Sequence, residues 1–565
     1  MCASPSALSA PIALYDTTLR DGAQQEGLSL SVEDKLRIAR SLDALGIPFI
    51  EGGWPGANPK DVQFFWQLRE EPLERAQVVT FCSTRRPGGS AKDDRMLQAI
   101  LAAGTECATV FGKSWDLHVT EGLGTTLTEN LEMIRDTIAF LRSQQRRVFY
   151  DAEHWFDAYQ RNPDYALETL HAAAQAGAEW LVLCDTNGGM FPEEIERVTG
   201  AVMAESHHWP GVKVGIHTHN DGELAVANAI ASVRAGAEMV QGTINGYGER
   251  CGNANLCSLI PNLQLKLGYQ CIPSENMALL TETSRSVSEA ANMAPDDRAP
   301  FVGLSAFAHK GGIHVSAVRK NPLTYEHLEP ERVGNTRRIV VSEQAGISNI
   351  AAKLSSFGVE IPKTNPMLRD ILQRLKQLEH QGYQFEAAEA SFELLVRGCL
   401  NQRPQLFELT SFHVHCTTQN QAIAAVVPLA GSGTDVQAIA TVKVVVKGET
   451  RITAAEGNGP VSALDGALRK ALVEFYPAIA DMQLADYKVR ILDGQAGTDA
   501  RTRVLIAFVS TPSSAQPARR WTTIGVSENI IEASYQALAE GLEYGLSDRL
   551  GWLQGDAIAA LRSQS

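Results

Sequence analysis

Two short segments, far apart in the chain, contain side chains that could together bind a metal ion. Arg20 and Asp21 follow a strand-like run that ends at Tyr15, while His217 and His219 stand at the end of another such run. Side chains two residues apart on a strand lie on the same face, so both imidazoles can point the same way. Together with the Asp21 carboxylate they would form a three-ligand site with open positions.

Other interpretations of these residues stay open at this point. Arg20 and Asp21 could form an ordinary loop ion pair, and the two histidines could simply be hydrogen-bonded in a loop. Two imidazoles and one carboxylate are also the ligands of ferrous oxygenases. The ligand types therefore do not name a reaction by themselves.

The elements that would position these residues alternate between strands and helices. The eight predicted strands are 12–15, 49–51, 78–82, 107–111, 148–151, 180–184, 212–216 and 239–243. Amphipathic segments such as 127–141 and 223–235 separate them. This order predicts an α/β fold, a (β/α)8 TIM barrel, whose chemistry lies at the carboxyl ends of the strands. An open doubly wound sheet is the alternative, but its Gly-rich loop after the first strand is missing.

One kind of helix-to-strand junction recurs along this region. A glycine stands just past the expected helix end, where the left-handed backbone conformation is favoured, and a strand follows. These glycines are Gly46, Gly104, Gly177 and Gly236. Ser31 is expected to cap the first helix.

Three further polar residues follow predicted strands. Glu153, Thr186 and Asn253 come after the fifth, sixth and eighth strands. Each could merely stabilise a loop. Their common position at strand carboxyl ends is, however, what a barrel active site requires.

Size and composition favour a globular protein of several domains, because 565 residues exceed what a single core organises. A net charge of −15 argues against nucleic acid as a partner. No apolar run approaches the ~20 residues of a membrane span, so no membrane contact is expected. The cysteines are scattered without CxxC pairs and the start does not resemble a signal peptide, which favours the cytoplasm.

The chain is predicted to divide into four parts. Residues 1–10 form a disordered tail and 11–271 form the catalytic TIM barrel. Residues 272–403, interrupted by prolines, form helical accessory subdomains, and 404–565 form an α+β domain.

The last part contains strand patterns and a rough internal repeat. The predicted strands are 407–415, 438–446, 487–492 and 504–509. In the repeat, 453–459 leads into a helix at 461–472 as 522–527 leads into a helix at 530–542. Gly457, Gly459 and Gly525 are interpreted as turn residues, either for tight turns alone or to expose backbone N–H groups to a carboxylate.

Three motifs together resemble one enzyme family. They are TTLRDGAQ at 17–24, HTHND at 217–221 and GERCGN at 248–253. The chain is similar to the acyl-CoA-condensing branch of the Asp-Arg-Glu metal-dependent TIM-barrel enzymes, which contains the 2-isopropylmalate, homocitrate and citramalate synthases. The likeness extends to their C-terminal regulatory domain, through 457–461 and 525–534.

Within this branch, two segments most resemble the citramalate synthases. They are EGGWPGANP at 51–59 and HKGGIH at 309–314. Isopropylmalate synthases usually carry Phe-Pro in the first segment and an acidic residue or Ser before the Gly in the second. They also usually carry Asp where this chain has Ser316, so the bond of such a carboxylate is not expected here.

The resemblance implies a role for each matching residue near the metal. Asp21, His217, His219 and, nearby or as a further ligand, Asn253 would hold a divalent ion. Mg2+ or Mn2+ is expected, with Zn2+ or Co2+ as alternatives. Arg20 would hold the 2-oxo acid and its developing alkoxide.

It also implies roles for residues around the substrates. Thr186 would bind the carboxylate of the 2-oxo acid, and Gln24 would contact the substrate. Glu153 would contribute to the pocket for acetyl-CoA or the 2-oxo acid. His314 and Tyr325, from the accessory subdomains, would activate water or relay a proton.

The implied activity is the condensation of acetyl-CoA with pyruvate to (R)-citramalate and CoA, on a route to isoleucine. Trp54 and Phe111 are expected to crowd the methyl pocket, although each could equally be barrel core. A synthase for another 2-oxo acid is one alternative, and a related lyase, which generally lacks the C-terminal domain, is a second. An amino-acid-sensing protein with an inactive barrel is the third. A homodimer and an effector, isoleucine or leucine, are also implied.

Overall fold

Two compact units make up the chain in a computed structural model. The structure describes residues 10–340, 346–359, 361–362, 364–418, 436–493, 497, 500–511 and 519–550. The first unit contains the chain up to Phe307 together with His327–Arg337, and the second contains Ala308–Glu326 and the chain from Arg338 onward. The predicted tail at 1–10 lies, except for residue 10, outside the described residues. Within them, no helix combines the length and apolarity that crossing a bilayer needs.

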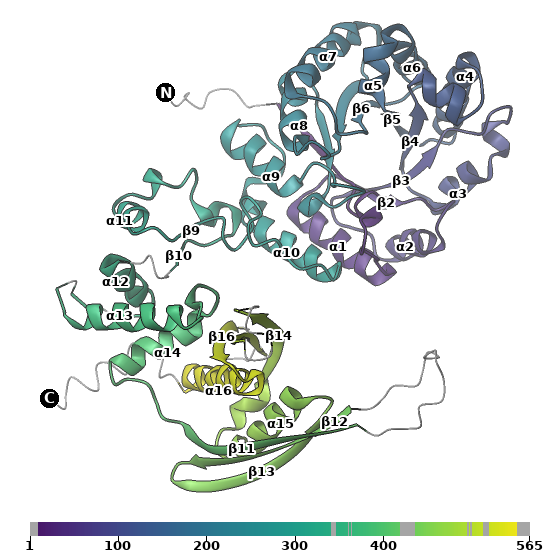
Figure 1. Ribbon diagram of the computed structural model, residues 1–565. Helices are drawn as coiled ribbons and strands as arrows, with labels where there is room; N and C mark the ends of the chain where they lie inside the picture. The colour runs from purple at the N-terminus through teal and green to yellow at the C-terminus, as the bar shows by residue number, and fades with distance from the viewer. Residues whose placement is uncertain are drawn as a thin grey trace. The chain divides into compact units, whose positions relative to one another are not determined.

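The first unit is built around a closed barrel of parallel strands in chain order (Figure 1). Its strands are β1 (Ala13–Asp16), β2 (Phe49–Gly53), β3 (Gln77–Ser83), β4 (Cys107–Lys113), β5 (Arg147–Glu153), β6 (Trp180–Asp185), β7 (Lys213–Thr218) and β8 (Met239–Gly242). β1 closes the barrel by pairing with β8, with Tyr15 opposite Gln241. The predicted TIM barrel and its eight strands are confirmed.

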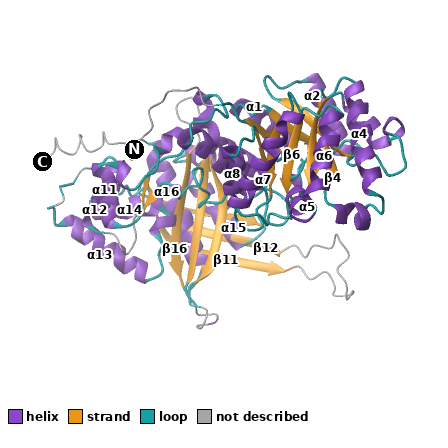
Figure 2. Cartoon of the chain, turned by 90° about the horizontal axis from the view of Figure 1, so that it is seen from above, coloured by secondary structure: helices purple, strands orange, loops and turns teal. Residues whose placement is uncertain are grey.

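Helices cover the outside of the strands, as the view from above in Figure 2 shows. They are α1 (Val32–Leu45), α2 (Pro59–Glu70), α3 (Arg95–Ala103), α4 (Leu127–Ser143), α5 (Trp155–Arg161), α6 (Pro163–Gln175), α7 (Pro192–Glu205), α8 (Ala225–Arg234), α9 (Leu256–Pro261) and α10 (Leu280–Ala290). Ser31 caps α1, since its hydroxyl accepts from the Asp34 N–H while the Asp34 carboxylate accepts from the Ser31 N–H. The four junction glycines have the predicted positive φ, between 76° and 118°.

Alternation along the strands sorts the barrel residues into two apolar layers. Outward residues such as Leu14, Ile50 and Val240 pack against the helices. Inward residues such as Phe149 and Met239 fill the barrel interior. Because side chains alternate along a strand, polar residues two positions further on face the same interior, toward the carboxyl ends.

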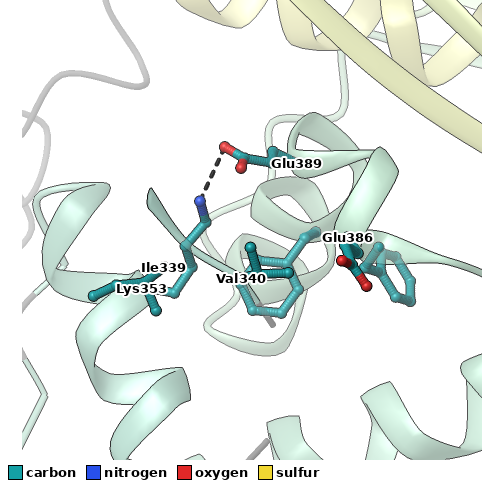
Figure 3. A pocket seen from close by; sticks show the side chains of 7 residues that line it. Ile339, Val340, Lys353, Glu386 and Glu389 are labelled. Carbon is teal, nitrogen blue, oxygen red and sulfur yellow. Dashed lines mark ion pairs between the residues drawn. The ribbon is translucent and has the colours of Figure 1, made fainter. Parts of the chain in front are cut away.

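The second unit begins with short helices. β9 (Ala308–His309) pairs with β10 (Arg338–Ile339), and α11 (Gly312–Lys320) lies between them in the chain. After β10 come α12 (Ile347–Ser356), α13 (Met367–His380) and α14 (Glu389–Cys399). A narrow pocket lies between α12, α14 and β10 (Figure 3). The Glu389 carboxylate there accepts from Lys353 Nζ at 2.9 Å and from Arg338 at 2.8 Å. Ion pairs of Glu389 with two cationic side chains thus lie at this pocket.

Two copies of a three-stranded antiparallel sheet with one helix complete the unit. The first copy comprises β11 (Phe407–Thr418), β12 (Val436–Val446), β13 (Glu449–Gly457) and α15 (Pro460–Leu472), and the second comprises β14 (Met482–Ile491), β15 (Thr502–Ser510), β16 (Arg519–Ser527) and α16 (Ile530–Arg549). The predicted repeat is therefore confirmed. The strands β13 and β16 were not among the predicted ones.

The second copy corrects the interpretation of Gly525. This residue lies inside β16 and not in a turn. A Cβ there would lie 1.9 Å from the Ala533 carbonyl oxygen and 2.9 Å from Gln536 Cβ, so the glycine lets α16 approach the strand. At the equivalent contact of the first copy, the glycine is on the helix and not on the strand, since Ala455 on β13 packs on Gly466 of α15. The packing requirement, not a turn, thus accounts for Gly525.

Candidate metal and active site

The loop after β1 is fixed to the loop after β8. Asp16 accepts hydrogen bonds from the Thr18 N–H at 2.9 Å and the Thr18 hydroxyl at 2.8 Å. The Thr18 hydroxyl in turn accepts from the Ile244 N–H at 2.9 Å. These bonds hold Arg20 and Asp21 at the carboxyl end of the barrel.

Asp21, His217 and His219 lie together at this end, and all three are buried. Asp21 Oδ2 lies 3.5 Å from His217 Nε2 and 3.9 Å from His219 Nε2. One ligand atom from each residue lies within 4.8 Å of the other two. A carboxylate and two imidazoles converging in this way fit a divalent metal ion.

The protonation states agree with metal binding. Burial, with the neighbouring His219, lowers the pKa of His217 to about 3, so its imidazole is neutral and keeps a lone pair. Burial alone would raise the pKa of Asp21, but Arg20 and the two histidines hold it below its usual value. The carboxylate is therefore ionised at neutral pH.

Asn253 stands beside this group. Its backbone forms a bridge with His219, and its side chain is 1% exposed. The Asn253 Nδ2 donates to the Tyr247 carbonyl at 3.1 Å. Among the described residues, its Oδ1 finds no hydrogen-bond partner, and neither does Nδ1 of His219. A buried acceptor oxygen without a partner is rare, and a bound cation would satisfy it.

Glu51 fixes Arg20, and the sequence analysis did not single it out. Arg20 Nε donates to Glu51 Oε2 at 2.5 Å, and the Tyr15 hydroxyl donates to Glu51 Oε1 at 2.8 Å. Burial raises the pKa of Glu51 even though Arg20 opposes the shift. The guanidinium carbon of Arg20 lies 3.7 Å from the centre of the Phe81 ring. The sequence signal that could have pointed to Glu51 is a single carboxylate at the end of an otherwise apolar predicted strand.

Trp54, Phe81 and Phe111 form an aromatic cluster beside Arg20. The rings of Phe81 and Phe111 stack with their centres 5.2 Å apart. Trp54 meets both edge-on at 5.8 Å. The structure thus groups the two residues expected to crowd the substrate pocket and adds Phe81, which the sequence analysis missed.

The remaining predicted residues of the barrel lie on its carboxyl-end loops. Glu153 forms an ion pair with Lys113. The Thr186 hydroxyl accepts from the His154 N–H at 2.9 Å. Gln24 is exposed on the turn Gly22–Gln24. Glu153 and Thr186 are thus each held by a neighbouring protein group.

His314 and Tyr325 lie together in the second unit. Their rings stack with centres 4.1 Å apart, and both side chains are exposed. Nearby, His309 Nε2 and Glu326 Oε1 form a buried contact of 2.9 Å, which anchors the start of this segment. An exposed, paired imidazole and phenol can exchange protons with a bound ligand or water.

The two glycines of the first C-terminal copy differ in their surroundings. Gly457 is the last residue of β13, and a Cβ there would lie 2.5 Å from the Ala463 nitrogen. Gly459 is the N-cap of α15, with open space where a Cβ would be. In the second copy Asn529 caps α16 through its side chain, which accepts from the Ile531 and Glu532 N–H groups. The start of α15 has no such side-chain cap.

The barrel, its buried Asp-His-His group and the repeated C-terminal sheets define the class of the protein. Residues 11–287 match the HMGL-like family model. Residues 301–383 match the homocitrate synthase post-HMGL domain-like model, and 386–546 match the LeuA allosteric (dimerisation) domain. The chain is an HMGL-like barrel protein with a LeuA-type allosteric domain.

Comparison with similar proteins narrows the class to one enzyme family. The (R)-citramalate synthase of Synechocystis sp. is 65% identical and the match covers 94% of this chain and 96% of the relative. The (R)-citramalate synthase of Aquifex aeolicus is 50% identical over 94% of this chain and 97% of the relative. The 2-isopropylmalate synthase of Methanocaldococcus jannaschii is 31% identical over 95% of each. This chain belongs to the (R)-citramalate synthase family and is a condensing transferase.

Proposed function

We propose that the protein condenses acetyl-CoA with pyruvate to give (R)-citramalate and CoA. The observation that carries this proposal is the grouping of Asp21, His217 and His219 beside Arg20, at the carboxyl end of the barrel. Relatives named (R)-citramalate synthase over most of the chain support it.

In this proposal, Asp21, His217 and His219 hold a divalent ion, and Asn253 Oδ1 is a further ligand. The carboxylate, the amide oxygen and bound water suit Mg2+ or Mn2+, our first choice, whereas the two imidazoles make Zn2+ or Co2+ the alternatives. A bound ion supplies Lewis acidity, which makes the keto carbon of a chelated 2-oxo acid more electrophilic.

Arg20 acts on the charge that develops during condensation. A base takes a proton from the methyl group of acetyl-CoA, and the resulting enolate carbon attacks the keto carbon. The keto oxygen becomes an alkoxide, which then takes up a proton to give the hydroxyl group. The guanidinium, held by Glu51 before the reaction begins, stabilises that oxygen without having to reorganise. Thr186 binds the carboxylate of the 2-oxo acid, and Gln24 contacts the substrate.

Hydrolysis of the thioester completes the reaction. Water attacks the thioester carbon, the carbon–sulfur bond breaks, and CoA leaves with a proton on its sulfur. We assign activation of this water, or relay of its proton, to the stacked pair His314 and Tyr325. Glu153, held by its ion pair with Lys113, contributes to the pocket for acetyl-CoA or the 2-oxo acid.

The aromatic cluster supports pyruvate over larger 2-oxo acids. The Arg20 guanidinium lies over the Phe81 ring, and the rings of Phe111 and Trp54 pack beside it. Three large side chains next to Arg20 favour a 2-oxo acid with a small side chain over a branched one. A synthase that accepts 2-oxoisovalerate or another 2-oxo acid is the alternative. The experiment that separates them is a thiol-release assay with acetyl-CoA and a panel of 2-oxo acids. CoA release with pyruvate and formation of citramalate support the proposal, whereas preference for 2-oxoisovalerate overturns it.

Regulation and assembly form the second part of the proposal. We assign the catalytic domain to 11–271, the accessory subdomains to 272–403 and a regulatory domain to 404–565. The regulatory domain joins two chains into a homodimer and binds an end-product amino acid, isoleucine first and leucine second. The start of α15 near Gly457 and Gly459, which has no side-chain cap, is the site we favour, because the first-turn N–H groups that follow Pro460 suit a carboxylate. The free thiols of the described cysteines support a cytoplasmic location.

A further inference from the structure

The His217 ring is held by a chain of hydrogen bonds that crosses the barrel interior. His217 Nδ1 lies 3.0 Å from Gln241 Oε1, and Gln241 Nε2 donates to Asp151 Oδ1 at 3.0 Å. The three residues come from β7, β8 and β5, and none is more than 6% exposed. Gln241 lies opposite His217 in the register of β7 and β8, so the first bond joins direct neighbours.

The order of donors and acceptors in this chain fixes the tautomer of His217. The amide nitrogen of Gln241 faces the Asp151 carboxyl, whose Oδ1 accepts its N–H. The amide oxygen of Gln241 then faces His217 and needs a proton on Nδ1. The lone pair is thereby confined to Nε2, the atom 3.5 Å from Asp21 Oδ2.

The two histidines differ in this respect. His219 Nδ1 finds no hydrogen-bond partner among the described residues, although it is buried. His217 is therefore the imidazole whose orientation is set in advance, and Gln241 is the residue that sets it. A histidine that donates its second N–H to a fixed acceptor is a more basic and better-oriented metal ligand.

From this geometry we propose that Gln241, anchored by Asp151, is a positioning residue for the His217 ligand. The inference rests on the proposed metal site. In this proposal Gln241 and Asp151 touch neither the ion nor the substrates and act only through His217. Breaking their hydrogen bonds should therefore weaken metal binding.

Calorimetric titration of the metal-free, full-length protein with Mn2+ tests the proposal without measuring activity. Gln241→Met keeps the side-chain length and removes both hydrogen bonds, so Mn2+ should bind about 10- to 100-fold more weakly. Gln241→Glu keeps an acceptor for His217 Nδ1, and a proton shared between its carboxyl group and that of Asp151, whose pKa is raised by burial, replaces the lost amide N–H. This variant should therefore bind Mn2+ within a few-fold of the wild type. The absorption bands of bound Co2+ should change in Gln241→Met and be restored in Gln241→Glu. Asp151→Leu combined with Gln241→Met should lose no more affinity than Gln241→Met alone, since the chain is already broken.

A matched control separates positioning from general loosening of the barrel. Asn228 is also a fully buried amide, whose Nδ2 donates to the Met190 carbonyl at 2.8 Å and lies 3.4 Å from Asp185 Oδ2. Asn228→Met should change thermal stability but leave Mn2+ affinity unaltered. Equal losses of affinity in Asn228→Met and Gln241→Met, or wild-type affinity in Gln241→Met, would overturn the inference.

The proposed metal site fails in a different way. If the wild type and His217→Ala bind Mn2+ equally, the ligand assignment is wrong. If His217→Ala loses binding while Gln241→Met keeps it, only the positioning role is wrong. Should Gln241→Met not fold, the Gln241→Glu variant still decides, because a large loss of affinity in that variant contradicts the proposal.

Discussion

Replacing Glu51 with Gln tests whether the catalytic competence of Arg20 depends on a buried partner. Glu51 is fully buried, and its two oxygens accept from Arg20 Nε and from the Tyr15 hydroxyl. The Gln side chain has the same shape but no charge and only one acceptor oxygen. Tyr15 keeps a second partner, the Thr109 hydroxyl at 2.6 Å. The loss is therefore concentrated on Arg20.

The size of the effect follows from the kind of bond removed. A hydrogen bond between charged groups contributes about 1.5–3 kcal/mol. If Arg20 stabilises the alkoxide, that loss appears in the transition state and lowers kcat/KM about 10- to 150-fold. We expect kcat to carry most of the decrease, while KM for acetyl-CoA changes little.

The assay is CoA release with acetyl-CoA and pyruvate, and the control is Glu179→Gln. Glu179 accepts from Arg147 at 2.7 and 2.8 Å, at the opposite, amino-terminal end of the strands. That variant loses the same kind of bond and should keep its kcat/KM. Wild-type kcat/KM in Glu51→Gln, or equal losses in both variants, would refute the reasoning.

Three further outcomes are expected. His217→Ala should abolish turnover without unfolding the protein. Removal of the metal from the wild type with a chelator should also abolish turnover until Mg2+ or Mn2+ is added. CoA release at the wild-type rate by His217→Ala would contradict the metal assignment. Pyruvate should have a far higher kcat/KM than 2-oxoisovalerate, since each extra methyl group in a filled pocket costs about 1–3 kcal/mol, and Phe111→Val should narrow that gap; an unchanged ratio argues against the aromatic pocket. Gly459→Asp adds a negative charge where a Cβ has open space around it, so this variant should condense pyruvate normally but resist inhibition by isoleucine. Gly459→Ala should remain inhibited by isoleucine. Full inhibition of Gly459→Asp by isoleucine would place the effector site elsewhere.

Much of the fold could be predicted from the sequence because its signals are local. Alternating strands and helices, with a glycine such as Gly46 just after a helix end, follow from backbone preferences that each segment expresses alone. The spacing of His217 and His219 on a strand likewise puts both on one face whatever surrounds them. The order of these local signals along the chain was sufficient to predict the barrel.

The C-terminal strands show where local signals are weak. β13 reads Glu-Thr-Arg-Ile-Thr-Ala-Ala-Glu-Gly and is largely exposed or half-buried, so it lacks a clear apolar alternation. The sequence predicts a turn at Gly525, because glycine usually marks one. Its actual reason, the close approach of α16 at Ala533, involves a contact that is not visible in the neighbouring sequence.

The sequence by itself determined which residues can carry the chemistry, since Arg20, Asp21, His217 and His219 stand in motifs at strand ends. Only the tertiary structure decided how they are held. Glu51, Asp151 and Gln241 are buried polar residues among apolar neighbours on their strands, and a strand pattern does not tell which distant side chain each one meets. Closing the barrel brings β5, β7 and β8 around one interior, and there burial makes each of these polar groups find a partner.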